Sequence, residues 1–197
     1  IFAIMGIICN YCYNSSLQKV YNGTTRDAII LVHGLASSPA IFNNVIGDIK
    51  LTGQPFQVWT FGYSSQRTIE EISKEFRDLL ETKSNEFDNI YIAAHSLGGL
   101  ITQKALRDSY NSSYNYIGKV KKVILVGVPN EGSIFLEVYE KLYRILINRA
   151  AKYNNIFNVN SKLVDTLKNG MLTEKVPGID YYVIAGTNPY ELGKISE

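Results

Sequence analysis

Histidine and cysteine are scarce in this sequence, and long apolar runs and strong charge clusters are missing. There are two histidines and two cysteines in 197 residues, and 20 Lys and Arg nearly balance 18 Asp and Glu. The largest basic cluster is the short run at 119–122. A dedicated nucleic-acid surface needs more positive charge than this, so we expect no nucleic-acid partner. Cys9 and Cys12 form one C-x-x-C without a second pair, so we expect no metal site.

The start of the chain is apolar but too short to cross a bilayer. Residues 1–9 are almost all apolar, whereas a span needs about 20 residues. Such a stretch is typical of the end of a signal peptide or membrane anchor, and a buried or edge strand is the alternative. We therefore expect residues 1–12 to be the remnant of a leader and 13–197 to be one domain. A secreted or membrane-associated protein is expected, with the cytoplasm as the alternative.

Apolar runs alternate with amphipathic segments along the rest of the chain. This pattern predicts an α/β protein with a mostly parallel sheet. Ser38 with Pro39 predicts a helix start, and Thr68 with Glu71 predicts a capping box. The expected strands are 28–32, 56–61, 90–94, 123–126 and 181–185, and the expected helices are 39–48, 68–80 and 98–107.

One insert has an unusually wide apolar face, at residues 134–147. Residues 133–175 are therefore expected to form a lid over an apolar substrate site. A helix packed on the sheet is the alternative, because an amphipathic helix usually serves packing.

The motif that indicates most about function is Ala94-His95-Ser96-Leu97-Gly98, which lies between an expected strand and an expected helix. A serine with very small residues two positions away on either side is typical of a nucleophile elbow. The turn is sharp, so it strains the serine and brings the flanking segments close together. Gly98 suits this close approach fully, and Ala94 adds one methyl group.

Two more motifs follow other expected strands in the order of a known fold. Val32-His33-Gly34-Leu35 comes after the first strong strand, and Gly127-Val128-Pro129-Asn130-Glu131-Gly132-Ser133 comes after the strand that follows the elbow. Together the three motifs resemble the α/β-hydrolase fold, in its lipase and esterase branch, over about residues 27–186. The resemblance implies a mostly parallel central sheet with helices on both faces, incomplete at its C-terminal side.

The resemblance also implies roles for individual residues. Ser96 would be the nucleophile, and the backbone N–H groups of Leu35 and Leu97 would form the oxyanion hole. The residues that would shape these loops are His33, Gly34, Ala94, His95, Gly98 and Gly99. The implied function is hydrolysis of carboxylic esters, above all lipid acyl esters, through an acyl-enzyme at Ser96 without a cofactor. Its partners would be a small-molecule or lipid ester and a membrane surface.

The rest of a catalytic triad is hard to find in this sequence. In this fold the order is Ser, then acid, then His, and no histidine follows Ser96. Glu131 follows a strand and is an acid candidate, with a surface turn as its alternative role. The other aspartates considered fall at the wrong ends of elements: Asp108, Asp165 and Asp180.

Two hypotheses follow from this gap. The first is a fragment of a serine ester hydrolase whose acid and histidine are not among these residues, and which is nearly inactive alone. The second is a non-catalytic α/β-hydrolase-like binding protein that lacks the triad histidine.

Overall fold

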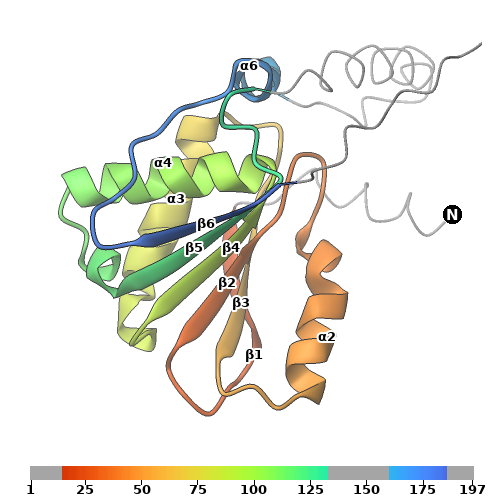
Figure 1. Ribbon diagram of the computed structural model, residues 1–197, viewed down its shortest axis with the longest axis vertical. Helices are drawn as coiled ribbons and strands as arrows, with labels where there is room; N and C mark the ends of the chain where they lie inside the picture. Colours follow the sequence, from red (N-terminus) through yellow and green to blue (C-terminus); the bar gives the residue numbers. More distant parts are fainter. Residues whose placement is uncertain (1–14, 133–159, 186–197) are drawn as a thin grey trace, which may run out of the picture.

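The computed structural model describes residues 15–132 and 160–185 (Figure 1). The expected leader remnant at 1–12, which includes Cys9 and Cys12, lies outside these ranges, as does the apolar stretch at 134–147. Every helix within residues 15–132 and 160–185 is too short or too polar to span a bilayer.

A six-stranded sheet organises the fold, with the strand order β1-β3-β2-β4-β5-β6. All neighbouring strands are parallel except β1, which pairs antiparallel with β3. The predicted mostly parallel sheet is therefore confirmed. The strands are β1 Ser16–Tyr21, β2 Ala28–Val32, β3 Gln57–Gly62, β4 Ile90–His95, β5 Val120–Val126 and β6 Asp180–Ile184.

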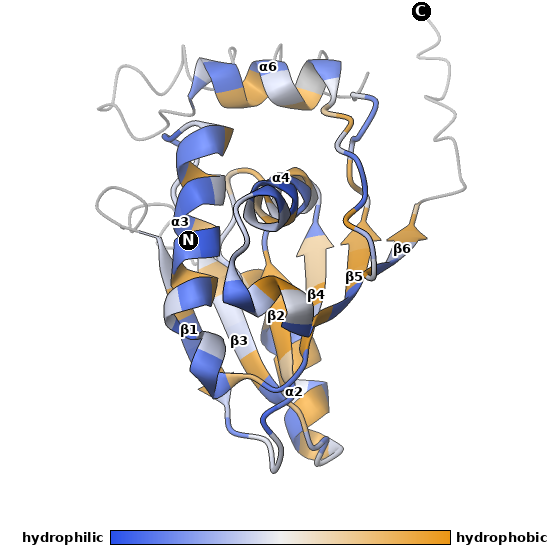
Figure 2. Ribbon diagram, turned by 90° about the vertical axis from the view of Figure 1, so that its left-hand side faces the viewer, coloured by the Kyte–Doolittle hydropathy of each residue, from blue (hydrophilic) through white to orange (hydrophobic). Residues whose placement is uncertain are grey.

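Helices cover the two faces of this sheet unequally (Figures 1 and 2). Because side chains alternate along a strand, Ile30 and Trp59 face α3 and α4, whereas Leu31 and Val58 face α2. Both faces of β2 are thus apolar, as a central parallel strand requires. The helices are α2 Asn43–Leu51, α3 Ile69–Thr82, α4 Leu97–Asn111 and α6 Ser161–Asn169, with short 3-10 turns at Pro39–Phe42, Ser84–Glu86 and Asn115–Lys119.

Of the two predicted helix starts, one is confirmed and the other is wrong in its bounds. The capping box is confirmed: Glu71 N donates to Thr68 Oγ1 (3.3 Å), and Thr68 N donates to the Glu71 carboxylate (2.8 Å). The predicted helix over 39–48 is wrong in its bounds, because Pro39–Phe42 is a 3-10 turn and α2 begins at Asn43. The Ser38 side chain makes no cap hydrogen bond there; its carbonyl accepts from Ile41 N instead, which closes the tighter turn (3.2 Å).

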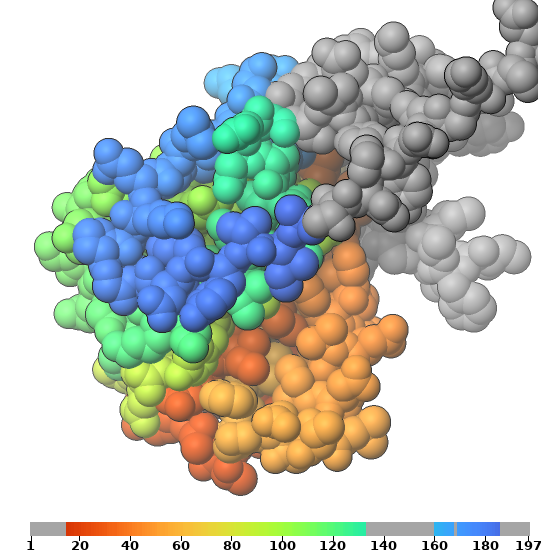
Figure 3. Space-filling model, in the orientation of Figure 1, coloured from red at the N-terminus to blue at the C-terminus, as the bar shows by residue number. Residues whose placement is uncertain are grey.

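The described end of the expected lid insert packs on the main core. Leu163 and Leu167 of α6 are buried with Val176, and α6 contacts α3. In Figure 3, residues 160–185 (blue) lie beside the turn after β5 (green), and α2 (orange) covers another part of the same view. The lid function remains a prediction.

Candidate active site

Ser96 occupies a strained turn between β4 and α4. Its φ of 51° and ψ of −124° lie in a region that non-glycine residues rarely adopt. Such a conformation costs about 1–3 kcal/mol and persists only where surrounding contacts enforce it. Here Ser96 N donates to Val126 O, and Gly99 N donates to Ser96 O, each at 2.9 Å. The sharp turn expected of an elbow is therefore present at Ser96.

Glycine is required just after the turn because β2 passes very close to α4. A Cβ on Gly98 would lie 2.3 Å from the carbonyl oxygen of His33 and 2.7 Å from that of Val32. A Cβ on Gly99 would lie 2.1 Å from the Val128 side chain, which belongs to the turn after β5. The three sequence motifs thus meet at the carboxyl edge of the sheet.

The expected oxyanion loop lies against the elbow. A Cβ on Gly34 would be 3.1 Å from Ser96 Cβ and 3.0 Å from His95 Nδ1, so the Gly34 backbone lies close to both residues and an added methyl group would crowd them. Leu35 follows in this loop. Leu97 is the first residue of α4, and the first N–H groups of a helix have no intrahelical acceptor. The structure therefore brings the Leu35 loop and the start of α4 to the same place as Ser96.

His33 is fully buried and both of its ring nitrogens are engaged. Nδ1 lies 2.9 Å from Gly34 O, which can only accept, so Nδ1 donates. Nε2 then accepts from Tyr63 N (3.4 Å). Burial lowers the pKa of His33 to about 4, the hydrogen bond to Gly34 raises it, and nearby His95 lowers it. His33 is thus a neutral ring that shapes the loop, with no free nitrogen to take a proton from Ser96.

His95 is partly exposed, but its Nδ1 atom is buried and has no hydrogen-bond partner among residues 15–132 and 160–185. The ring packs against Gly34, on the side of the loop. The elbow-shaping role expected for His95 stays a prediction.

In the described residues the candidate carboxylates form no hydrogen bond or ion pair with either histidine. Glu131 is exposed in the turn after β5, and Asp165 is exposed on α6. Asp108 pairs with Lys104 and Arg77 at the far end of α4, at 3.2 and 3.6 Å. Asp180 opens β6 at the edge opposite the elbow. In the described parts, none of these four is joined to a histidine, and no cluster of three His, Cys, Asp or Glu could hold a metal ion.

Two residues near the site, Tyr63 and Ser65, belong to none of the sequence motifs. Tyr63 stacks on the His33 ring with centroids 4.2 Å apart, and its hydroxyl donates to His33 O (2.8 Å). Ser65 Oγ accepts from Ala36 N (3.1 Å). Their position in the sequence could have indicated them, because they directly follow a parallel strand, at the edge of the sheet where such folds place their sites.

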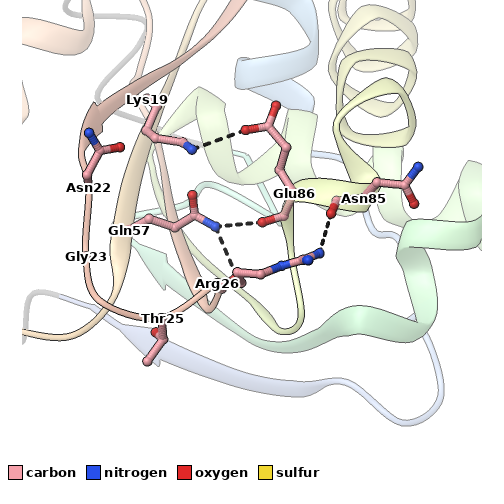
Figure 4. Close-up of a pocket in the computed structure, with 8 residues that line it drawn as sticks. All are labelled: Lys19, Asn22, Gly23, Thr25, Arg26, Gln57, Asn85 and Glu86. Atoms are coloured by element: carbon pink, nitrogen blue, oxygen red, sulfur yellow. Dashed lines mark hydrogen bonds and ion pairs between the residues drawn. The ribbon is translucent and has the colours of Figure 1, made fainter.

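A separate hollow of about 350 Å³ lies near the other end of the sheet (Figure 4). Its polar groups satisfy one another: Lys19 pairs with Glu86 at 3.2 Å, and Gln57 donates to the carbonyl oxygens of Arg26 and Glu86. We assign this hollow no part in the site at Ser96.

Comparisons with known proteins fit this architecture. A family model described as "Putative serine esterase (DUF676)" matches residues 25–128. No curated protein matches the sequence. Among solved structures, the chain resembles an esterase of a marine microorganism with 13% identity and a TM-score of 0.60, over 89% of this chain and 92% of that one.

Two further solved structures resemble the chain over most of its length. A carboxylesterase structure from the thaumarchaeon Nitrososphaera gargenis has 14% identity and a TM-score of 0.57, over 88% of this chain and 86% of that one. A monoacylglycerol lipase of Paleococcus ferrophilus has 13% identity and a TM-score of 0.54, over 88% and 90%. At these identities the likeness concerns the fold, and it confirms the predicted α/β-hydrolase fold.

Proposed function

Because the chain belongs to the "Putative serine esterase (DUF676)" family, we propose that it cleaves carboxylic esters through a covalent acyl-enzyme on Ser96. The predicted lipase and esterase branch is confirmed by this membership, and ester hydrolysis is the general activity of the branch. Small-molecule esters are the corresponding substrates. We extend the proposal to lipid acyl esters because the branch includes lipases and the insert at 134–147 is strongly apolar.

The observation that carries the proposal is the strained turn at Ser96 with the Gly34 backbone packed against it. In the proposed reaction Ser96 Oγ attacks the ester carbonyl carbon and the alkoxy C–O bond breaks. The alcohol leaves with the serine proton, and water later releases the acid from Ser96. The N–H groups of Leu35 and Leu97 would stabilise the transient oxyanion, and each such donor is typically worth a factor of about 10²–10³ in rate.

A general base is needed for this reaction, and in the described residues no hydrogen bond joins Ser96 to either histidine. Both ring nitrogens of His33 are engaged, His95 packs against Gly34, and the sequence holds no third histidine. We therefore expect the 197-residue chain alone to hydrolyse p-nitrophenyl esters only very slowly. The same observation favours a second candidate function, a non-catalytic protein that binds esters without cleaving them.

A fluorophosphonate probe tests the proposal without requiring turnover. Ser96 would displace fluoride, forming a P–O bond while hydrogen fluoride leaves, and intact-mass spectrometry would detect the adduct. We expect one slowly formed adduct on the peptide that holds Ser96, none in Ser96→Ala, and normal labelling in Ser109→Ala, a buried serine later on the same helix. No adduct after long incubation would favour the binding protein. Fast Ser96-dependent ester turnover would contradict the expected lack of a base.

A further inference from the structure

The Leu35 N–H shares a peptide unit with the Gly34 carbonyl. Because a trans peptide is planar, the N–H points away from the carbonyl oxygen of the same unit. The His33 ring donates from Nδ1 to Gly34 O at 2.9 Å. This hydrogen bond fixes the direction of the carbonyl and therefore the direction in which the Leu35 N–H points.

His33 is itself held by Tyr63 through three contacts, two to its ring and one to its backbone carbonyl oxygen. The rings stack with centroids 4.2 Å apart and 4° between their planes. Tyr63 N donates to Nε2 at 3.4 Å, and this hydrogen bond keeps the proton of the neutral ring on Nδ1. The Tyr63 hydroxyl donates to His33 O at 2.8 Å, and that oxygen lies against Gly98. Burial raises the pKa of the Tyr63 phenol well above its usual value, so it remains a donor.

The peptide unit on the other side of Leu35 is held by Ser65. Ala36 has a φ of 48°, which is unfavourable for a residue with a Cβ, and its N–H donates to Ser65 Oγ at 3.1 Å. Ser65 is anchored in turn, because its carbonyl oxygen accepts from Asn160 N at 2.9 Å. Tyr63 and Ser65 therefore hold both peptide units around Leu35 from one loop, the loop after β3.

We propose that Tyr63 and Ser65 are positioning residues that fix the direction of the Leu35 N–H toward Ser96. The inference rests on the proposed function, in which this N–H stabilises the oxyanion. Neither residue needs to touch the substrate. Their effect comes from preorganisation, because an oxyanion donor is useful only when it already points at the developing charge.

Two variants test this, each with a matched control. Tyr63→Phe keeps the ring stack and the backbone N–H but removes the donor to His33 O, and Ser65→Ala removes the acceptor for Ala36 N. The controls are Tyr116→Phe and Ser109→Ala. Each removes the buried hydrogen bond of 2.7 Å between the Ser109 and Tyr116 hydroxyl groups. We expect Tyr63→Phe and Ser65→Ala to slow fluorophosphonate labelling of Ser96 about tenfold. The controls should lower the melting temperature without slowing the labelling.

A second readout needs no chemistry at Ser96. With two histidines in the chain, ¹⁵N spectra of the imidazoles should show His33 as the neutral ring protonated on Nδ1. The amide signals of Gly34 and Leu35 should shift in Tyr63→Phe and Ser65→Ala and stay in place in both controls. If the wild-type protein takes no label, the proposed function fails and these amide shifts alone decide the inference. It is overturned by a His33 proton on Nε2, by unmoved amide signals, or by labelling that falls equally in all four variants.

Discussion

At the scale of single residues, burial decides what the two histidines can do. His33 is fully buried between a carbonyl and an amide, so it stays neutral with a fixed tautomer. His95 is next to the candidate nucleophile in sequence, yet its ring packs against Gly34. A histidine near a serine in sequence is therefore no evidence of a general base: both nitrogens of His33 are hydrogen-bonded, and no hydrogen bond joins His95 to Ser96 in the described residues.

The pKa of His33 predicts how stability depends on pH. It is about 4 in the folded protein against 6.5 for an ordinary histidine, so the unfolded chain binds a proton that the folded chain excludes. The free energy of unfolding should therefore fall as pH falls from 6.5 to about 4, by about 3 kcal/mol from this residue. Urea unfolding across that range measures the loss. His33→Asn keeps an N–H donor but does not titrate, so its free energy of unfolding should fall less over this pH range. A fall equal to that of the wild-type protein would refute the prediction.

At the scale of elements, the site depends on how closely α4 approaches the end of β2. Gly98 contacts the carbonyl oxygens of Val32 and His33, which are backbone atoms and cannot move aside as a flexible side chain would. This contact brings the start of α4 next to the Gly34 loop. The distance between these two elements thus sets the distance between the candidate nucleophile and the candidate oxyanion donors.

Gly98→Ala should therefore lower the free energy of unfolding by about 2–4 kcal/mol, since overpacking against backbone is among the costly classes of substitution. It should also abolish labelling of Ser96. Gly47→Ala in α2 is the matched control: nothing lies within 4 Å of the added Cβ, so it should stabilise by about 0.5–1 kcal/mol. Denaturant unfolding measures both variants, and equal effects would show that the close approach is not what requires glycine.

At the scale of the whole molecule, the central strands of the sheet are covered more fully than the edge strands. β2 and β4 each have two strand neighbours, whereas β1 and β6 each have one. β6 also leaves apolar side chains in solvent, with Val183 62% and Ile184 58% exposed. The candidate site lies at the carboxyl ends of the central strands β2 and β4, which suits a site that depends on a fixed backbone.

Amide hydrogen exchange should follow this order. We expect the slowest exchange in β2 and β4 and much faster exchange in β6 and β1, because opening an edge strand exposes less apolar surface than opening a central one. Exchange measured by mass spectrometry on peptides of each strand tests this. Protection of β6 equal to that of β4 would contradict it and would indicate that further contacts cover this edge.

Local patterns in the sequence predicted much of this fold. β2 has the predicted bounds, and the capping box at Thr68 is present, because both depend on residues close together in the chain. β1 was not predicted, because an edge strand buries little and Leu17 is its only buried residue. The proline at position 39 predicts an α-helix but begins a 3-10 turn at Pro39–Phe42, because a proline at the first position suits both.

Local residue patterns dictate the alternation of strands and helices and the three motifs around Ser96, since each motif is a local turn with its own residue requirements. The side chains that support those turns depend instead on how the strands are arranged in the sheet. Tyr63 and Ser65 reach His33 and Ala36 across about thirty residues of chain, because β3 lies beside β2 in the sheet. Strand order is set by packing of the whole sheet, so no local pattern could have identified these contacts.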